Sequence, residues 1–179
     1  MSPALSIANL ASNSIKTRRV AILVADGVDQ TDVGFMIKAL AARGAMCDVS
    51  AQKLGSVSGE DGVSIAVDCS AITGDSMMYD AVYIPGGKSS ADALAISPKA
   101  LLFVVEAFGH AKPVAAIGAG VTVLGAANLP ATIADEHSGG IVNDLGVVTT
   151  VNSIDGGFAE AVLTAIAGYR YFDRPQASS

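Results

Sequence analysis

Cysteine and basic residues are scarce in this sequence. Its 179 residues include two cysteines, Cys47 and Cys69, which are too few for a disulfide framework and lie in no Cys-x-x-Cys or Cys/His pattern of a zinc site. Lys and Arg number 11 against 17 Asp and Glu, so the net charge is −6. Phosphate-binding surfaces need clustered basic side chains, and the only basic doublet is Arg18-Arg19. The composition therefore argues against a disulfide scaffold, a metal site and a nucleic-acid partner.

Long apolar runs are absent as well. No stretch approaches the roughly 18 consecutive apolar residues that span a bilayer, and residues 1–15 lack the basic start of a signal peptide. We therefore predict a soluble protein without a membrane partner, while the cell compartment stays open. With 51% hydrophobic and 16% charged residues, the chain can form one compact domain. We predict a flexible leader or linker over residues 1–17, a domain over 18–172 and a tail over 173–179.

Short apolar segments alternate with amphipathic ones along the chain. Continuous apolar runs bounded by Gly, Pro and Asp indicate strands that are buried on both faces, as in a parallel sheet. The strands are expected at residues 19–25, 45–51, 80–84 and 114–117, with hairpins at 56–67 and 141–150. Helices are expected between them, opened by Asp29 or Thr31, by Ser97 and by Asp155. This alternation predicts an α/β fold: a flavodoxin-like, doubly wound, mostly parallel sheet sandwiched by helices.

Two helices have predicted buried faces, and the two cysteines have different predicted surroundings. The faces are expected at Leu101, Leu102, Val105 and Phe108 of the helix after Ser97-Pro98, and at Phe158, Val162, Ile166 and Tyr169 of the last helix. Cys47 lies in the middle of a strand and is expected to be a buried structural thiol. The sequence leaves the surroundings of Cys69 open, although the neighbouring Asp68 argues against a reactive thiol.

Three loops are candidates for a functional site, because ligands of doubly wound folds gather at the carboxyl ends of the strands. They are the loop 26–32, the turn Pro85-Gly86-Gly87 and the turn Gly118-Ala119-Gly120. The last turn joins an apolar strand to a helix, the arrangement that presents a nucleophile in many α/β enzymes. Here the turn carries Gly118 and no nucleophile. Gly118 is therefore either an ordinary tight-turn glycine or the remnant of a nucleophile elbow, and the local sequence favours neither.

Taken in this order, the three loops resemble the PfpI-type branch of the class I glutamine amidotransferase-like superfamily. In its catalytic members a cysteine stands at the elbow, a glycine pair helps to form the oxyanion hole, and an acid at the start of the first helix holds the cysteine. The resemblance implies that Gly118 occupies the cysteine position, in a vestigial elbow Gly118-Ala119-Gly120. It also implies a vestigial oxyanion turn, Gly86 and Gly87, and a vestigial acid, Asp32. We therefore expect no catalytic, cofactor-binding or metal-binding residue in this chain.

Three longer strings carry a narrower resemblance: RVAILVADGV (19–28), YDAVYIPGG (79–87) and EAFGHAKPVAA (106–116). They are similar to the C-terminal domain that large-subunit haem catalases carry behind their catalytic core. The resemblance implies a homotetrameric parent that decomposes hydrogen peroxide, with haem held in its core and not in this chain. The chain itself would be an accessory domain, an ATP-independent chaperone or stabilising module. Its partners would be the catalase core of the same polypeptide and non-native client proteins.

Other functions remain as alternatives. The chain could be a self-standing PfpI-type hydrolase or glyoxalase-like enzyme that uses Thr122 or Cys69, or a small-ligand sensor that uses the vestigial pocket. His137 lies downstream of the elbow, as a triad histidine would, but in a polar loop, and His110 is expected at a helix end. The segment Tyr169–Arg174 is the nearest likeness to a haem-ligating tyrosine motif, yet it continues a helix and has no recognisable distal histidine.

Overall fold

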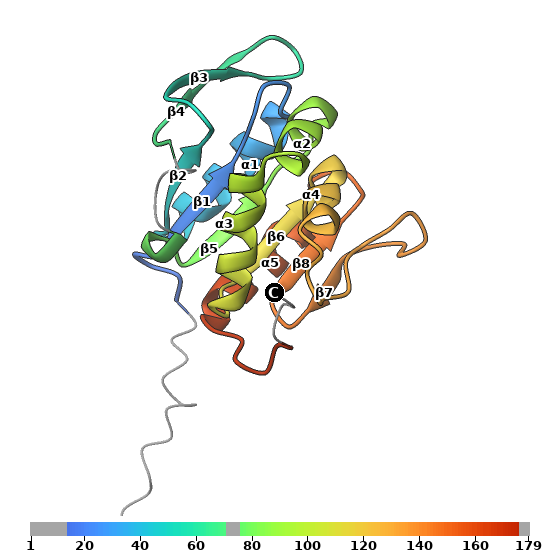
Figure 1. Cartoon of the computed structure of the whole chain (residues 1–179). Coiled ribbons are helices and arrows are strands. Elements are labelled where there is room, and N and C mark those ends of the chain that lie inside the picture. Colours follow the sequence, from blue (N-terminus) through green and yellow to red (C-terminus); the bar gives the residue numbers. More distant parts are fainter. Residues whose placement is uncertain (1–13, 71–75, 176–179) are drawn as a thin grey trace, which may run out of the picture.

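A central sheet of six strands runs through the part of the chain that the computed structural model describes, residues 14–70 and 76–175 (Figure 1). Its strand order is β2-β1-β5-β6-β8-β7; the edge strand β7 is antiparallel to β8, and the other pairs are parallel. The strands are β1 (Arg19–Leu23), β2 (Met46–Ser50), β5 (Ala81–Ile84), β6 (Val114–Ile117), β7 (Val142–Asp144) and β8 (Val147–Thr150). A separate antiparallel hairpin consists of β3 (Gly55–Ser58) and β4 (Ser64–Val67).

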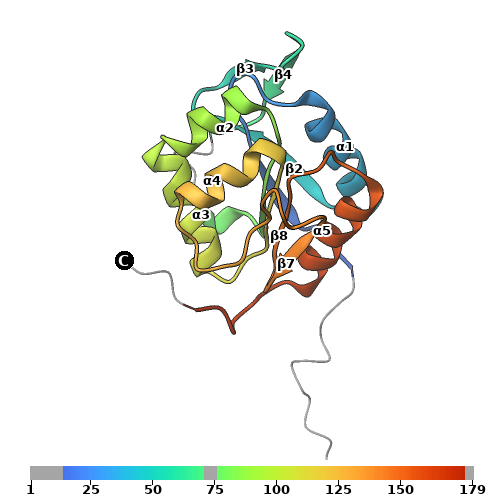
Figure 2. The same cartoon turned by 90° about the vertical axis from the view of Figure 1, so that its right-hand side faces the viewer.

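Helices cover both faces of the sheet (Figure 2). The helices α1 and α5 lie on one face, and α2, α3 and α4 lie on the other. Their bounds are α1 (Gln30–Ala42), α2 (Lys88–Ala95), α3 (Pro98–Gly109), α4 (Val121–Ala126) and α5 (Gly156–Gly168), with 3-10 turns η2 (Ser76–Met78) and η3 (Gly118–Gly120). None of the helices in the described residues is long and apolar enough to cross a bilayer.

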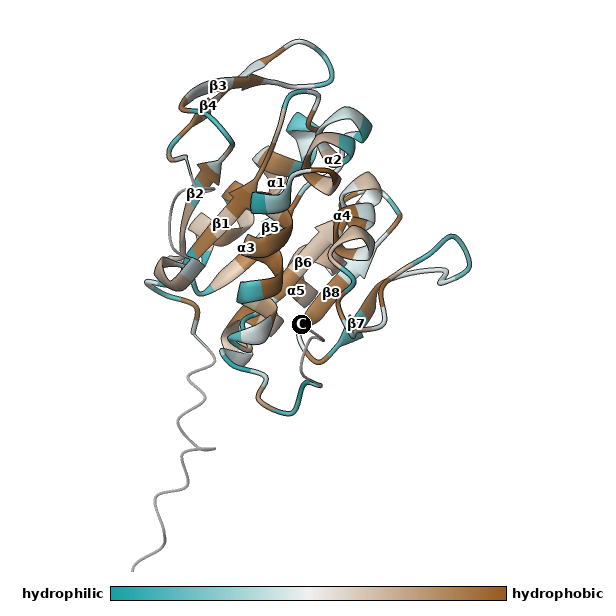
Figure 3. Ribbon diagram, in the orientation of Figure 1, coloured by the Kyte–Doolittle hydropathy of each residue, from teal (hydrophilic) through white to brown (hydrophobic). Residues whose placement is uncertain are grey.

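The inner parallel strands are largely apolar because both of their faces are covered. Val20 and Ile22 of β1 pack toward α1 and α5, whereas Ala21 and Leu23 pack toward α2, α3 and α4. Every residue of β5 and β6 is buried, and Figure 3 shows hydrophobic residues concentrated along the strands. Burying one Val, Leu or Ile side chain contributes about 1.5–3 kcal/mol, so these two apolar layers are the main source of stability. The flavodoxin-like fold predicted from the sequence is confirmed.

The helix starts also follow the sequence signals. The side chains of Asp29, Ser97 and Asp155 each accept a backbone N–H in the first turn of α1, α3 and α5. Such a cap stabilises a helix by about 1 kcal/mol. Of the two caps considered for α1, the structure uses Asp29 and not Thr31.

Two predicted inward positions are wrong. Leu102 of α3 is 56% exposed, because the buried face of this helix runs through Ala100, Phe103 and Ala107, roughly a quarter turn or more around the axis. Tyr169 is 41% exposed, because it follows the last turn of α5 with a φ of 67°, which ends the helix and turns the ring outward. Both errors come from extending an amphipathic pattern to a residue whose direction depends on the packing of the whole helix.

The packed part of the chain extends beyond the predicted boundaries. Ile15 is buried in the core beneath α1 and α5, and the Thr17 N–H donates to the Gly44 carbonyl at 2.9 Å. At the other end, the Arg174 guanidinium donates to the carbonyls of Leu145 and Lys112, both at 2.7 Å. Packing therefore includes residues that the sequence assigned to the leader and the tail. Residues 1–13 of the predicted leader and residues 176–179 of the predicted tail lie outside the described residues.

Candidate functional site

The structure brings the three predicted loops together at the carboxyl ends of β1, β5 and β6. The Gly86 N–H donates to Asp32 Oδ2 at 2.9 Å, and the Asp29 N–H donates to the Gly86 carbonyl at 2.9 Å. A Cβ placed on Gly118 would lie 3.8 Å from the Gly86 Cα. The first turn of α1, the turn after β5 and the turn after β6 therefore form one continuous site, centred on Gly86.

Gly118 has the backbone conformation of an elbow. Its φ is +55°, in the left-handed region that L side chains rarely adopt. A Cβ there would meet only the Gly86 Cα within 4 Å, so the turn has room for a side chain that the sequence does not supply. The chain changes direction at this point, from the extended Ile117 into η3 and then α4. This is the strand, turn and helix geometry that lifts a nucleophile above a sheet.

The neighbouring glycines are needed for close packing. Gly87 has a φ of +102°, and a Cβ on it would lie 2.4 Å from the Gly27 carbonyl oxygen. A Cβ on Gly120 would lie 2.5 Å from the Pro85 carbonyl oxygen. Any larger residue at either position would separate the loops. These glycines therefore hold the site together, whether or not the site performs chemistry.

Asp32 is the titratable centre of the site. Its residue is 6% exposed, and burial raises the pKa of its carboxyl from 3.8 to about 6, opposed by the hydrogen bond from Gly86 and assisted by the nearby charges of Asp29 and Glu60. The Tyr83 hydroxyl donates to the Asp32 backbone carbonyl at 3.4 Å, which fixes the first turn of α1 over β5. A buried carboxyl with a strongly raised pKa is typical of functional sites, although it also occurs in purely structural settings.

The other predicted chemical groups lie elsewhere. His110 caps the end of α3, at the end of the sheet opposite the elbow, as the sequence indicated. His137 is exposed in the loop between α4 and β7, where its backbone N–H donates to Asp135 Oδ1. The Thr122 hydroxyl donates to the Ala119 carbonyl at 2.8 Å, from the start of α4 back to η3. Among the described residues, no group of three or more His, Cys, Asp or Glu side chains is placed to hold a metal ion.

The cysteines occupy opposite sides of the sheet near its β2 edge. Cys47 packs against the α1 and α5 core but is only partly buried, so the prediction of a buried thiol was too strong. Burial still raises its pKa, with further effects from Asp48 and Asp68. Cys69 lies beside β2 and packs on the α2 and α3 side. Its Sγ contacts the hydroxyls of Ser50 and Tyr79, a grouping that the sequence missed because the three residues share no local pattern.

The sheet is mostly parallel and lies between two helical layers, and the elbow turn after β6 meets the turn after β5. These features define a flavodoxin-like domain of the class I glutamine amidotransferase-like type. The model of the DJ-1/PfpI family matches residues 18–132. The chain therefore belongs to the DJ-1/PfpI family.

The curated relatives are catalases that are much longer than this chain. "Catalase HPII" of Mycobacterium avium is 36% identical over 178 residues, which is 97% of this chain and 25% of that protein. "Catalase-2" of Bacillus subtilis is 31% identical over 174 residues, 97% of this chain and 23% of that protein. The chain thus spans about a quarter of the length of these relatives. The resemblance to a domain of large-subunit catalases, first drawn from three strings, is confirmed.

A solved structure agrees on the fold. The ThiJ/PfpI domain protein from Brachyspira murdochii superposes with a TM-score of 0.74 at 20% identity, covering 84% of this chain and 97% of that one. At this identity the likeness extends to the fold alone.

Proposed function

We propose that this chain is the C-terminal accessory domain of a large-subunit haem catalase, and that it acts without chemistry of its own as an ATP-independent chaperone or stabilising module. The similarity to catalases over 97% of the chain supports the first part. The second part rests on one observation: at the position where the fold presents a nucleophile, Gly118 supplies only hydrogen while its backbone keeps the elbow conformation.

Among the described residues, neither Thr122 nor Cys69, the two alternatives that the sequence offered, is placed to replace the missing nucleophile. Thr122 is engaged with the Ala119 carbonyl inside its own helical turn. Cys69 lies beside β2, which is separated from β6 and its elbow by β1 and β5. Neighbouring strands are about 4.8 Å apart, so a thiol at this edge cannot use the turn at Gly86 or the carboxyl of Asp32. A hydrolase or glyoxalase reaction is therefore the weaker proposal.

The tyrosines near the C-terminus do not fit a haem site. The guanidinium groups of Arg18 and Arg170 lie over the Tyr169 ring, 3.9 and 4.0 Å from its centroid. The Tyr171 hydroxyl donates to the Ala165 carbonyl at 3.0 Å. An axial tyrosine needs a free phenolate oxygen and open space over one face. In the proposed parent, haem would belong to the catalytic part that this chain does not include.

The surface supports a role in holding partly unfolded proteins. Large apolar side chains are exposed on several elements, and the net charge is −6. The most exposed of them are Leu54, Val63, Met77, Met78, Ile96, Leu102 and Phe172. Apolar side chains can contact the exposed core of a client, and the negative charge keeps such a complex dispersed. The sequence contains no phosphate-loop motif to drive a nucleotide cycle, so we expect holding and not active refolding.

The absence of thiol chemistry is tested with esters and methylglyoxal as substrates. We expect no turnover by the chain, because a thiolate is the nucleophile that such reactions need. Variants with Cys47 or Cys69 replaced by Ser serve as controls. Turnover that disappears with either replacement would show that a second thiol has taken over, and the proposal of a domain without chemistry would fail.

The holding role is tested by light scattering from a heat-labile enzyme at increasing concentrations of the chain. We expect slower aggregation without ATP, and weaker protection by the double variant Ile96→Ser/Phe172→Ser, whose replaced side chains are 82% and 83% exposed. The matched control is Lys99→Ser/Glu136→Ser, which replaces two exposed polar side chains at the same net charge. Equal protection by an inert protein of the same acidity would reduce the effect to charge and crowding.

A further inference from the structure

A cavity of about 320 Å³ lies between the end of α3 and the segment that follows α5. Its volume falls within the range of small-molecule sites, roughly 300–1,000 Å³, which are mostly apolar and carry a few polar groups. One charged side chain, that of Arg174, lies among the described residues that line it. The walls otherwise include Val105, Phe108 and Gly109 of α3 and, after α5, Tyr171, Phe172 and Pro175.

Arg174 is held at this cavity by backbone carbonyls. Its Nε donates to the Leu145 carbonyl at 2.7 Å, and its Nη1 donates to the carbonyls of Lys112 at 2.7 Å and Phe108 at 3.2 Å. The Phe108 carbonyl belongs to the last turn of α3, where the helix dipole favours a cation. Carbonyls carry only partial negative charge, so the positive charge of the guanidinium is not fully compensated.

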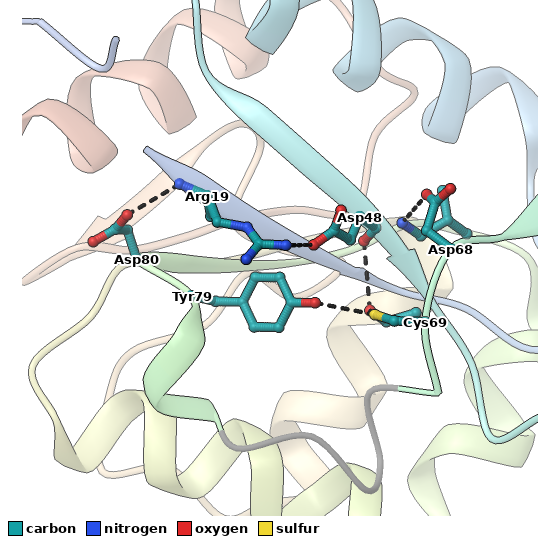
Figure 4. Close-up of polar contacts among 8 residues, drawn as sticks. Arg19, Asp48, Asp68, Cys69, Tyr79 and Asp80 are labelled. Carbon is teal, nitrogen blue, oxygen red and sulfur yellow. Dashed lines mark hydrogen bonds and ion pairs between the residues drawn. The ribbon is translucent and has the colours of Figure 1, made fainter. Parts of the chain in front are cut away.

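Arg174 also lacks an acidic partner. Arg19, by comparison, is paired with the carboxylate of Asp48 (Figure 4). In the part of the chain that the structure describes, the ion pairs join other residues and none includes Arg174. Asp144, whose charge acts on Arg174, has its Oδ2 engaged by the Thr132 N–H at 2.7 Å. The protein therefore supplies no counter-ion in contact with this guanidinium.

The third nitrogen of the guanidinium, Nη2, is buried and has no hydrogen-bond partner. Burial lowers the pKa of Arg174 to about 10, so the group still carries its charge at neutral pH. A buried charged donor without an acceptor destabilises a folded protein, and such a group calls for an explanation. An anion in the adjoining cavity would supply both the missing acceptor and the missing negative charge.

We propose that this cavity binds a monocarboxylate with an apolar chain. The carboxylate faces Arg174, and the chain packs against Val105, Phe108 and Phe172. A carboxylate fits better than a phosphate group, because one guanidinium nitrogen is available and a phosphate takes several donors. At about 30 Å³ for each water-sized group, the cavity has room for roughly ten non-hydrogen atoms, as in octanoate. The site lies apart from the elbow and does not depend on the function proposed above.

The wall at Phe172 gives a ligand access to Nη2. This nitrogen is covered in the empty cavity. Phe108 is 2% exposed and belongs to the core, and the Tyr171 hydroxyl is fixed on the Ala165 carbonyl. Phe172 is 83% exposed, so its ring can change rotamer without disturbing the core. Binding therefore requires a movement of one surface side chain and leaves the carbonyl contacts of Arg174 in place.

The experiment titrates the ¹⁵N-labelled chain with sodium octanoate at pH 7 and follows its backbone amides by NMR. We expect saturable shifts at Val105, Gly109 and Phe172, with a Kd of about 1 mM or lower. The matched probe is 1-octanol, which has the same chain length and no charge. It should bind at least about 10-fold more weakly, because a hydrogen bond to an ionised acceptor is replaced by one to a neutral group.

Two substitutions on α3 test the location. Val105→Phe places a ring in the cavity and should weaken octanoate binding at least about 10-fold. Leu102→Phe introduces the same side chain on the same helix, at a position that is 56% exposed and not among the lining residues, and should leave the affinity unchanged. Phe172→Ser removes an exposed wall of the cavity and should weaken binding about 3-fold or more.

Several results would overturn the proposal. Equal affinity for 1-octanol would mean that the charge of Arg174 is not used. Shifts centred on other surface residues, or full affinity in a folded Val105→Phe, would place octanoate elsewhere. Absence of saturation at octanoate concentrations on the order of 10 mM would exclude a site of this kind. If the amide spectrum shows that Val105→Phe is unfolded, Phe172→Ser decides the location, and full affinity in that variant would refute it.

Discussion

Replacing Asp32 by Asn should stabilise the protein at neutral pH. The residue is 6% exposed, and burial raises the pKa of its carboxyl to about 6, against 3.8 for an ordinary aspartate. The folded chain therefore holds its proton more tightly than the unfolded chain. As pH rises from about 4 to about 6, the unfolded state ionises first, and the stability of the wild type falls. The Asn side chain can still accept the Gly86 N–H and has no such titration.

The expected change in the free energy of unfolding follows from the raised pKa of Asp32. A difference of roughly two pKa units corresponds to about 3 kcal/mol between the two protonation states. The charge also lies in the first turn of α1, where the helix dipole favours a carboxylate by about 0.3–1 kcal/mol. The net gain expected for Asp32→Asn is therefore about 2–3 kcal/mol at pH 7. Below the unfolded pKa both side chains are neutral, so the two proteins should be nearly equal in stability.

Urea unfolding of both proteins from acid to neutral pH measures this difference directly. The other titrating groups are present in both proteins, so their contributions to the free energy of unfolding cancel. The difference between the two proteins therefore reports the titration of Asp32 alone. The matched control is Asp92→Asn on α2, an exposed acid whose replacement should change the free energy of unfolding by less than about 0.5 kcal/mol. A difference that does not vary with pH, or a variant less stable than the wild type at pH 7, would refute the assignment of a buried, destabilised carboxylate.

The remaining predictions concern backbone geometry and the C-terminal segment, and all are read from thermal or urea unfolding. Gly118→Cys should destabilise the protein by about 1–3 kcal/mol, because the space is open but the φ of +55° is strained for any side chain; a neutral result would mean that the turn is relaxed. Gly87→Ala should cost about 3 kcal/mol or more, because it adds a backbone clash to a positive φ. Gly34→Ala, within α1 and without neighbours within 4 Å, should stabilise by about 0.5–1 kcal/mol. Arg174→Met should cost about 2–3 kcal/mol, because three carbonyls lose a charged donor; an unchanged stability would show that water replaces it.

The glycines of the site show what a local sequence pattern can predict and what it cannot. The glycines after β5 and β6 marked tight turns, and the order of the loops suggested a shared site. What the turns require became visible only in three dimensions: Gly87 faces the Gly27 carbonyl, and Gly120 faces the Pro85 carbonyl. Gly118 differs from both, because space is available and only its φ restricts it. The same residue type therefore stands at these positions for different reasons, which no local pattern separates.

The sequence by itself determined the order of strands and helices along the chain, the capping residues of α3 and α5, and the fold class. Apolar runs, amphipathic periods and caps are local properties, since each depends on residues within one or two turns of the chain. It also located the glycine where the family resemblance places a nucleophile. Only the tertiary structure decided the outward direction of Leu102 and Tyr169, the raised pKa of Asp32 and the meeting of Cys69 with Tyr79. These depend on desolvation and on contacts between distant segments, which exist only after the sheet has formed and its loops have packed together.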